Sequence, residues 1–429
     1  MDERTTLLNQ VTSTLETLAG VREKMGKWVD AEVEEEEENC IFKIMEALYP
    51  FFLANHMYPV ELARIPLRDE TAIQDIRFVL KTISEEGFSP SPYLYVREKV
   101  EFTDTAATAL KLFTMVYNYI SKTDLKKKKE WGDLLGEIPL VIEKGINFLQ
   151  KCGYTDKKGL RWAGTDVGKI QKKSYFNVYF TSEVAIALNF VLKFTSNSLP
   201  KTKREEVEES IRKACFWVLG QQRRNIIYGD ESLIKGEINY FFYGLNCLFD
   251  CFDYLDRDQQ SKTASLFDNF LEEVRKGEEE LSFITYIDVP LSGYAKPIYY
   301  DDRSSIANII TILCKGRNIL RRQKAFDEVF FNTLNLYRRS LLDLKDVKND
   351  LWNKNNFLLY LNNRAIEALL YFASFGQTIV FEKLSEQSLV EALKNTLENP
   401  QIQQIFLSEL NRLVTLKAIN DYRPEGGES

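Results

Sequence analysis

The chain has 429 residues, of which 45% are hydrophobic and 28% are charged, and its 56 basic and 63 acidic side chains give a net charge of −7. This composition is typical of a globular protein with a large core, and it provides no excess of positive charge for a nucleic-acid backbone. The chain has a single histidine, His56. This excludes most zinc sites, and it excludes every Ser-His or Cys-His catalytic pair that does not use His56.

The first 38 residues are expected to form an acidic, helical segment that ends in the glutamate run at residues 34–38. Residues 1–27 carry scattered charges, whereas a signal peptide needs a continuous apolar stretch of about 7 to 15 residues. Apolar runs such as residues 306–314 are much shorter than the roughly 18 residues of a membrane span. The six cysteines show no regular disulfide framework. We therefore expect a soluble cytoplasmic protein with reduced thiols and no membrane span.

A helical repeat extends from residue 39 to about residue 420. Its recurring phrase is a short polar cluster followed by an apolar helix with Ala-Leu or a near equivalent, as in FTDTAATAL at residues 102–110 and FTSEVAIAL at residues 180–188. Successive phrases end 62, 78, 57, 65 and 59 residues apart, at the anchor residues Leu48, Leu110, Leu188, Leu245, Ile310 and Leu369. A period of this length is typical of stacked helical hairpins.

Each interval holds two kinds of helix. Residues 204–219 have apolar side chains at helical spacing on one face and charges on the other, which predicts an outer helix. Residues 240–249 are apolar almost all round, which is typical of a helix enclosed on every side. The alternation predicts an all-α (α/α)6 toroid of about six helical hairpins, followed by a disordered tail at residues 421–429. An open α-solenoid is the alternative, and it would leave one helix of each pair on an exposed concave face.

Residues 148–162 (FLQKCGYTDKKGLRW), continued by residues 180–188, resemble the repeat of the squalene cyclase and prenyltransferase superfamily, and residues 218–222 and 349–352 are weaker matches. The resemblance implies an α/α toroid. Class II terpene cyclases of this superfamily protonate an olefin with the middle carboxyl group of Asp-x-Asp-Asp, and Thr103 occupies that position here. The segment that begins Asp301-Asp302-Arg303 lacks the third carboxylate of the magnesium-binding motif of class I terpene synthases. His56 has no partners that match the zinc ligands of the protein prenyltransferases.

Candidate site residues follow from the helix starts, because function in such a toroid normally lies on loops and helix starts at one end of the ring. Asp, Asn and Ser at these positions also cap helices, so many of them have a structural role as well. Carboxylates that face each other across the mouth of the ring would suit glycosidase chemistry. The candidates are Asp104, Glu183, Glu237, Asn239, Asp301, Asp302, Arg303, Asn363 and Arg364.

The missing acid motif favours a non-catalytic or catalytically degenerate terpene cyclase-like toroid that binds a small molecule or a protein partner. The first alternative is a carbohydrate-active enzyme with a carboxylate pair at the mouth, and the second is a terpenoid cyclase-like enzyme with a displaced acid. No cofactor or metal is expected. Cys247 and Cys251 lie four residues apart on one helical face and could hold a soft metal, but nothing nearby in the sequence supplies further ligands.

Overall fold

A computed structural model of the chain describes residues 3–28, 40–62, 64–89, 101–164, 178–195, 199–221, 237–276, 302–321, 326–346, 351–352 and 358–383. In these residues it contains twelve α-helices, two short 3-10 helices and one two-stranded β-hairpin. The chain divides into two units, residues 1–374 and residues 375–429, and the arrangement below is that of the first unit.

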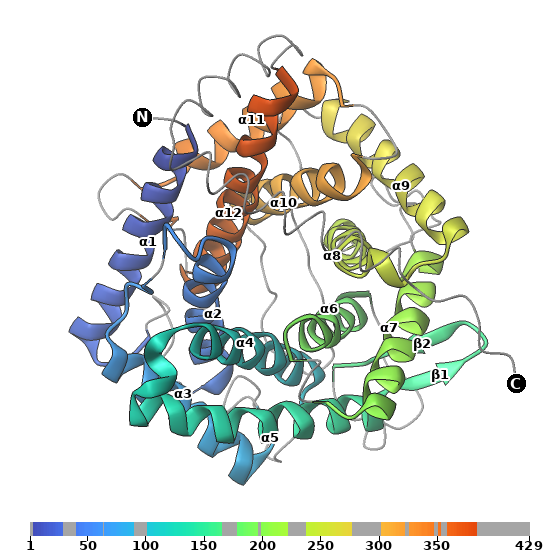
Figure 1. Ribbon diagram of the computed structural model, residues 1–429. Helices are drawn as coiled ribbons and strands as arrows, with labels where there is room; N and C mark the ends of the chain where they lie inside the picture. The colour runs from blue at the N-terminus through green and yellow to red at the C-terminus, as the bar shows by residue number, and fades with distance from the viewer. Residues whose placement is uncertain are drawn as a thin grey trace, which may run out of the picture. The chain divides into compact units, whose positions relative to one another are not determined.

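Inner and outer helices alternate along the chain, and the inner ones surround the centre of the unit (Figure 1). The outer helices are α1 (Glu3–Met25), α3 (Asp69–Glu86), α5 (Lys129–Cys152), α7 (Lys201–Gln221), α9 (Arg257–Lys276) and α11 (Glu328–Asp343). The inner helices are α2 (Ile41–Met57), α4 (Thr103–Lys122), α6 (Val178–Thr195), α8 (Glu237–Asp250), α10 (Asp302–Leu320) and α12 (Leu358–Lys383). The predicted (α/α)6 toroid of six hairpins is therefore confirmed.

The ring closes between α12 and α2. The Asn363 side chain on α12 donates a hydrogen bond to the Glu46 carbonyl on α2 at 2.6 Å, and the Tyr58 hydroxyl donates to the Leu370 carbonyl at 2.8 Å. These bonds join residues that are 317 and 312 positions apart in the sequence. The open α-solenoid does not fit a chain whose first and last inner helices are bonded to each other.

The inner helices are buried because apolar side chains cover nearly their whole circumference. All six anchor residues lie in inner helices, one in each, and none of their side chains is more than 1% exposed. Burial of a leucine-sized side chain contributes about 1.5 to 3 kcal/mol, so these positions define the core of the ring.

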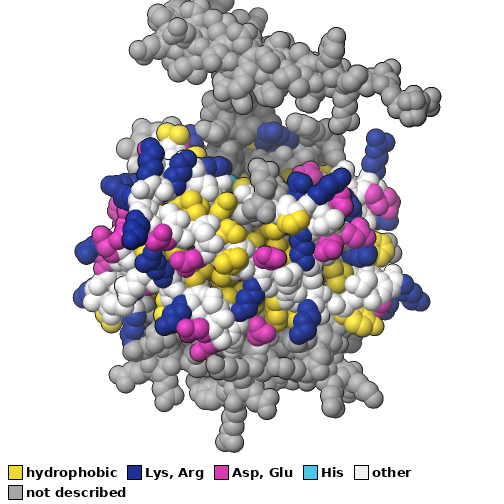
Figure 2. Space-filling view, turned by 60° about the horizontal axis from the view of Figure 1, so that its bottom comes forward, with side chains coloured by type: hydrophobic (Ala, Val, Ile, Leu, Met, Phe, Trp, Pro, Cys, Tyr) yellow, Lys and Arg dark blue, Asp and Glu magenta, His cyan; other side chains and the backbone are white. Residues whose placement is uncertain are grey.

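The outer helices are amphipathic. On α7 the buried residues include Val207, Ile211 and Val218, while Arg212 and Lys213 on the opposite face pair with Glu208 and Glu209. Basic and acidic side chains are intermingled over the face of the molecule shown in Figure 2. Each helix of this kind buries one stripe against the inner ring and leaves the other in water.

A tryptophan fastens the connection between the outer and inner helices in two of the hairpins. After the β-hairpin of β1 (Tyr154–Asp156) and β2 (Gly159–Arg161), the indole N–H of Trp162 donates to the Leu149 carbonyl at the end of α5. Trp352 donates to the Leu341 carbonyl near the end of α11 in the same way, and both bonds are 2.7 Å long. The bond from Trp352 satisfies a carbonyl group near the end of its helix, and the bond from Trp162 is a second one to the Leu149 carbonyl, which also accepts from the Gly153 backbone N–H at 3.1 Å. The Gly-Leu-Arg-Trp stretch in the sequence therefore serves the fold.

Helix α1 is tied into the ring at its C-terminal end. The Arg22 guanidinium donates to both oxygens of the Asp75 carboxylate on α3, at 3.1 and 2.7 Å, and the Trp28 indole donates to the same carboxylate at 2.8 Å. Residues 29–39 and 384–429 lie outside the described residues. The boundaries expected at residues 38 and 420, and the disordered tail at residues 421–429, therefore stay predictions.

Among the described residues, α6 alone is long and apolar enough to cross a membrane. However, 78% of it is buried inside the toroid. A core helix of a ring passes the same test of length and composition, and α6 also carries the buried Glu183, so its apolarity reflects its place in the inner ring.

Candidate functional site

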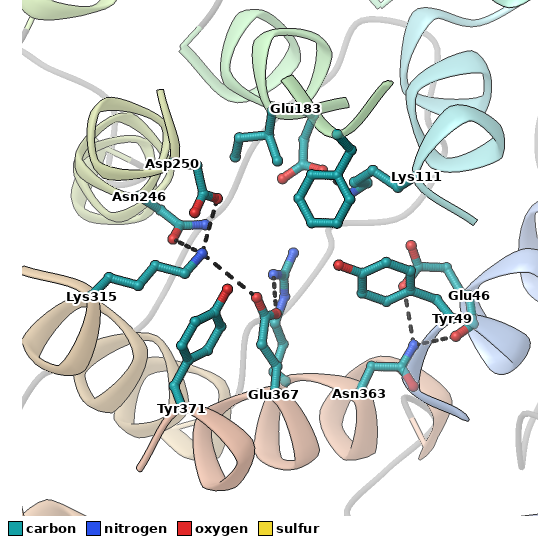
Figure 3. A pocket seen from close by; sticks show the side chains of 13 residues that line it. Glu46, Tyr49, Lys111, Glu183, Asn246, Asp250, Lys315, Asn363, Glu367 and Tyr371 are labelled. Carbon is teal, nitrogen blue, oxygen red and sulfur yellow. Dashed lines mark hydrogen bonds and ion pairs between the residues drawn. The ribbon is translucent and has the colours of Figure 1, made fainter. Parts of the chain in front are cut away.

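A small, partly open cavity lies inside the ring, and every inner helix contributes side chains to it (Figure 3). Its free volume of about 30 Å³ has room for water-sized molecules. The lining residues are Glu46, Tyr49, Lys111, Glu183, Ile186, Phe190, Asn246, Asp250, Lys315, Asn363, Arg364, Glu367 and Tyr371. Seven of these thirteen side chains carry a charge, so the centre of the toroid is polar although the helices that form it are mostly apolar.

Lys315 is the centre of one ion-pair network. Its ammonium group lies 2.9 Å from the Asp250 carboxylate, 2.7 Å from the Asn246 side-chain oxygen and 3.9 Å from the Glu367 carboxylate. Glu367 also pairs with Arg364 at 3.3 Å. The Lys315 side chain is only 5% exposed, so its ammonium group has lost its hydration water. These partners take the place of that water.

Glu183 forms a second buried ion pair, with Lys111 on the neighbouring helix α4. Burial alone would raise the pKa of Glu183, but the positive charges of Lys111, Arg364 and Lys315 outweigh it and hold the pKa below its ordinary value. Glu183 therefore stays ionised at neutral pH inside the ring.

Asp104 occupies the first turn of α4, near the end of the ring where the inner helices begin. Its carboxylate accepts a hydrogen bond from the Thr105 backbone N–H at 2.8 Å. Burial, together with the negative charges of Glu183 and Glu46, raises the pKa of Asp104 to about 7 in spite of this bond. Asp104 and Glu183 thus carry the same chemical group, and their surroundings shift its pKa in opposite directions.

Two tyrosines add hydroxyl groups to the cavity. Burial, together with the nearby Glu367 and Asp250 carboxylates, raises the pKa of both Tyr49 and Tyr371 well above the ordinary value. Their phenol groups therefore remain protonated and can donate hydrogen bonds. The Lys315 ammonium lies 4.6 Å from the centre of the Tyr371 ring, which gives it a cation–π contact in addition to its ion pairs.

The structure brings only some of the predicted site residues together. Glu183, Asn363 and Arg364 line the cavity, and Asp104 interacts electrostatically with Glu183. The remaining candidates lie at the beginning of two other inner helices, α8 and α10, or directly before α10. Glu237 and Asn239 lie in the first turn of α8, Asp302 and Arg303 lie in the first turn of α10, and Asp301 lies outside the described residues.

Most of the cavity residues lie away from the starts of the inner helices, where the sequence patterns predict the site. Lys111, Lys315 and Glu367 lie deeper in their helices, among apolar residues. A charged residue inside a helix that has no solvent-exposed face must point to another polar group. This signal was present in the sequence and indicates the centre of the ring.

Comparisons with known proteins support the fold. No family model matches the chain, and no curated protein matches it in sequence. An inactive variant of the α-1,6-mannanase GH76A from Salegentibacter sp. HEL1_6, solved with α-1,6-mannotriose, is 12% identical with a TM-score of 0.50, and the match covers 87% of this chain and 99% of the mannanase. Cellobiose 2-epimerase from Bacillus thermoamylovorans B4167 is also 12% identical, with a TM-score of 0.51 and coverage of 86% and 99%. A family 76 glycoside hydrolase from a bovine Bacteroides thetaiotaomicron strain is 7% identical, with a TM-score of 0.52 and coverage of 86% and 78%.

These neighbours correct two expectations. They share the toroid with this chain, but they are glycoside hydrolases and an epimerase, so the resemblance to the squalene cyclase and prenyltransferase superfamily is not supported beyond the fold. The interpretation as a non-catalytic, terpene cyclase-like module is contradicted by the same neighbours. A cavity lined by seven charged side chains is also poorly suited to an apolar terpenoid, because each charge would lose its polar surroundings to hydrocarbon. At identities of 7 to 12%, the likeness shows the fold, an (α/α)6 toroid.

Proposed function

We propose that this chain is a carbohydrate-active enzyme whose acid–base chemistry is carried by Asp104 and Glu183. One observation carries the proposal. The pKa of Asp104 is raised to about 7, whereas the pKa of Glu183 is lowered although the residue is buried. Two interacting carboxyl groups with pKa values pushed apart are the arrangement in which one acts as an acid and the other as a base.

The roles follow from the charge states. Asp104 holds a proton up to about pH 7 and donates it to the oxygen of the leaving group. Glu183 is ionised and either takes a proton from a water molecule or attacks the sugar carbon itself, which are the two established uses of a second carboxylate in glycoside cleavage. Lys111 keeps Glu183 ionised and fixes its position. The only histidine, His56, does not line the cavity, so no histidine takes part in this proton transfer.

The substrate class is supported by the polar groups of the cavity and by the neighbours. Amide, guanidinium and phenol groups of Asn246, Asn363, Arg364, Tyr49 and Tyr371 make the cavity polar, and groups of these kinds can hydrogen-bond a sugar hydroxyl that reaches in from the mouth. The cavity of about 30 Å³ is smaller than a sugar ring, so we place the saccharide at the mouth, next to the first turn of α4. The cavity then provides space for a water-sized reactant beside Glu183.

The first experiment is a substrate screen. The purified full-length chain is incubated with α-1,6-linked manno-oligosaccharides, cellobiose and other oligosaccharides. Release of reducing sugar measures hydrolysis, and NMR of the reducing-end sugar measures epimerisation. We expect turnover of at least one saccharide, with kcat/KM falling above about pH 7 as Asp104 loses its proton, and falling at acidic pH below 4.5 as Glu183 gains one.

Variants then test the two roles. Asp104→Asn and Glu183→Gln keep the shape of each side chain but cannot transfer a proton, so each should lower kcat by about 10² to 10⁴ while the chain stays folded. Asp124→Asn is the matched control, because the Asp124 side chain is 87% exposed on a 3-10 helix that follows α4, and it should keep the wild-type rate. Full activity in both Asp104→Asn and Glu183→Gln, or no turnover of any saccharide, would contradict the proposed function.

A further inference from the structure

Three cysteines meet in the core at the junction of α6, α7 and α8, apart from the residues that line the central cavity. Cys215 belongs to α7, Cys247 to α8, and Cys251 directly follows α8. Their sulfur atoms all lie within 4.8 Å of one another, and none of the three side chains is accessible to solvent. The sequence indicates the pair Cys247 and Cys251 by its helical spacing, whereas Cys215 reaches them only through the packing of α7 against α8.

We propose that Cys215, Cys247 and Cys251 form a binding site for one soft, three-coordinate ion held by three thiolates. The geometry fits this coordination. With bonds to sulfur of about 2.3 Å, a three-coordinate site places its sulfur atoms about 4 Å apart when it is planar and closer together when it is pyramidal, and both are inside the observed limit of 4.8 Å. Small changes of side-chain rotamer therefore suffice to close the site around an ion. Among the described residues this is the only group of three such ligands, so a fourth ligand for tetrahedral zinc is not in place.

The net charge of the complex decides which soft ion fits this buried site best. Three thiolates around Cu⁺ leave two negative charges in the core, and around Zn²⁺ they leave one. A net charge that is buried without a partner is unfavourable, and the charged group that acts on Cys247 and Cys251 is Asp250, whose own negative charge is paired with Lys315. A trivalent ion such as arsenic(III) gives a neutral complex. Arsenous acid, As(OH)₃, also reacts with protonated thiols: three As–S bonds form, three As–OH bonds break, three water molecules leave, and no atom is oxidised or reduced.

Mass spectrometry of the intact, reduced chain after incubation with arsenous acid tests this proposal. We expect a gain of one arsenic atom less three hydrogen atoms. Cys215→Ala, Cys247→Ala and Cys251→Ala should each abolish this gain. Cys152→Ala and Cys314→Ala are matched controls, because both cysteines are equally buried but lie outside the cluster, and both variants should bind arsenic as the wild type does. An unchanged mass, or a gain that survives loss of a cluster cysteine, would overturn the site.

A measurement on the wild type keeps the test valid if a variant does not fold. X-ray absorption at the arsenic edge should show three sulfur neighbours and no oxygen, and oxygen neighbours would contradict a three-thiolate site. The wild type incubated with zinc should retain less than one zinc per ten chains after desalting. Stoichiometric zinc that cannot be displaced by arsenous acid would refute the three-coordinate assignment.

Discussion

Asp104 and Glu183 show how the surroundings of a single residue set its charge state. Glu183 has Lys111 beside it and two further cations nearby, so its negative charge is stabilised although it is buried. Burial and two acidic neighbours act against the charge of Asp104 and outweigh its backbone hydrogen bonds, so its neutral form is stabilised instead. The difference between the two residues arises from their neighbours on other helices and is invisible in the sequence around either one.

The raised pKa of Asp104 has a consequence for stability. The folded chain binds this proton more tightly than the unfolded chain does, so the stabilising contribution is complete below the ordinary pKa of 3.8 and is lost as the pH rises to about 7. An asparagine at position 104 has no proton to lose, so Asp104→Asn removes this loss of stability at high pH. We expect the variant to be more stable than the wild type at pH 8 by about 1 to 4 kcal/mol, and equally stable at pH 4. Urea unfolding at the two pH values measures the difference, and a variant that is less stable at pH 8 would contradict the raised pKa.

Close contacts between the helices depend on small residues at particular places. Gly316 on α10 is the clearest case, because a Cβ atom there would lie less than 3.0 Å from ring atoms of Phe267 on α9 and Phe249 on α8. Both rings are fully buried, so neither can move into solvent. Gly136 on α5 is also helical, but a Cβ atom there would have no neighbour within 4 Å.

The two glycines should therefore respond to alanine in opposite ways. Gly316→Ala inserts a methyl group into a filled space and should lower the free energy of unfolding by about 1 to 3 kcal/mol. Gly136→Ala improves the helix propensity of an exposed position and should raise it by roughly 0.5 to 1 kcal/mol. Chemical denaturation of both variants checks the pair. Stabilisation by Gly316→Ala would show that α10 does not pack against Phe267 and Phe249 as described.

The sequence predicts the type of each helix and three of the cavity residues, Glu183, Asn363 and Arg364, but not which groups face one another across the cavity. All six anchor residues lie in inner helices, because a helix that is apolar on every side is stable in this fold only in the inner ring, where it is buried. The direction of Lys111 or Glu367 depends on the rotation of its helix and on the offset between neighbouring helices, and neither is encoded in a local pattern. For the same reason the third cysteine of the cluster, Cys215, was not linked to Cys247 and Cys251.

Closure of the ring is the property that belongs to the whole molecule. Each inner helix packs between two others only if α2 and α12 meet, and the Tyr58 hydroxyl secures this contact from a side chain that is 3% exposed. Tyr58→Phe removes the hydrogen bond and keeps the ring of the side chain. We expect a loss of about 1 kcal/mol in the free energy of unfolding, with an unchanged denaturant slope because the whole ring still unfolds together.

The control is Tyr154→Phe, because the Tyr154 side chain is 43% exposed on β1 and loses little when its hydroxyl is removed. This variant should unfold within about 0.5 kcal/mol of the wild type. If Tyr58→Phe were equally silent, or if it split the unfolding into two separate transitions, the contact between α2 and α12 would not have the closing role described here.

The hydrogen bond from Tyr58 to Leu370 also determines how late in synthesis the ring can close. A ribosome that adds about 5 to 20 residues per second needs about 15 to 60 s to cover the 312 positions between these two residues. Until then α2 lacks its neighbour α12, and the Tyr58 side chain, which is buried in the finished ring, lacks the Leu370 carbonyl to which it donates. The nascent chain therefore presents a binding site for chaperones that its mature form no longer has.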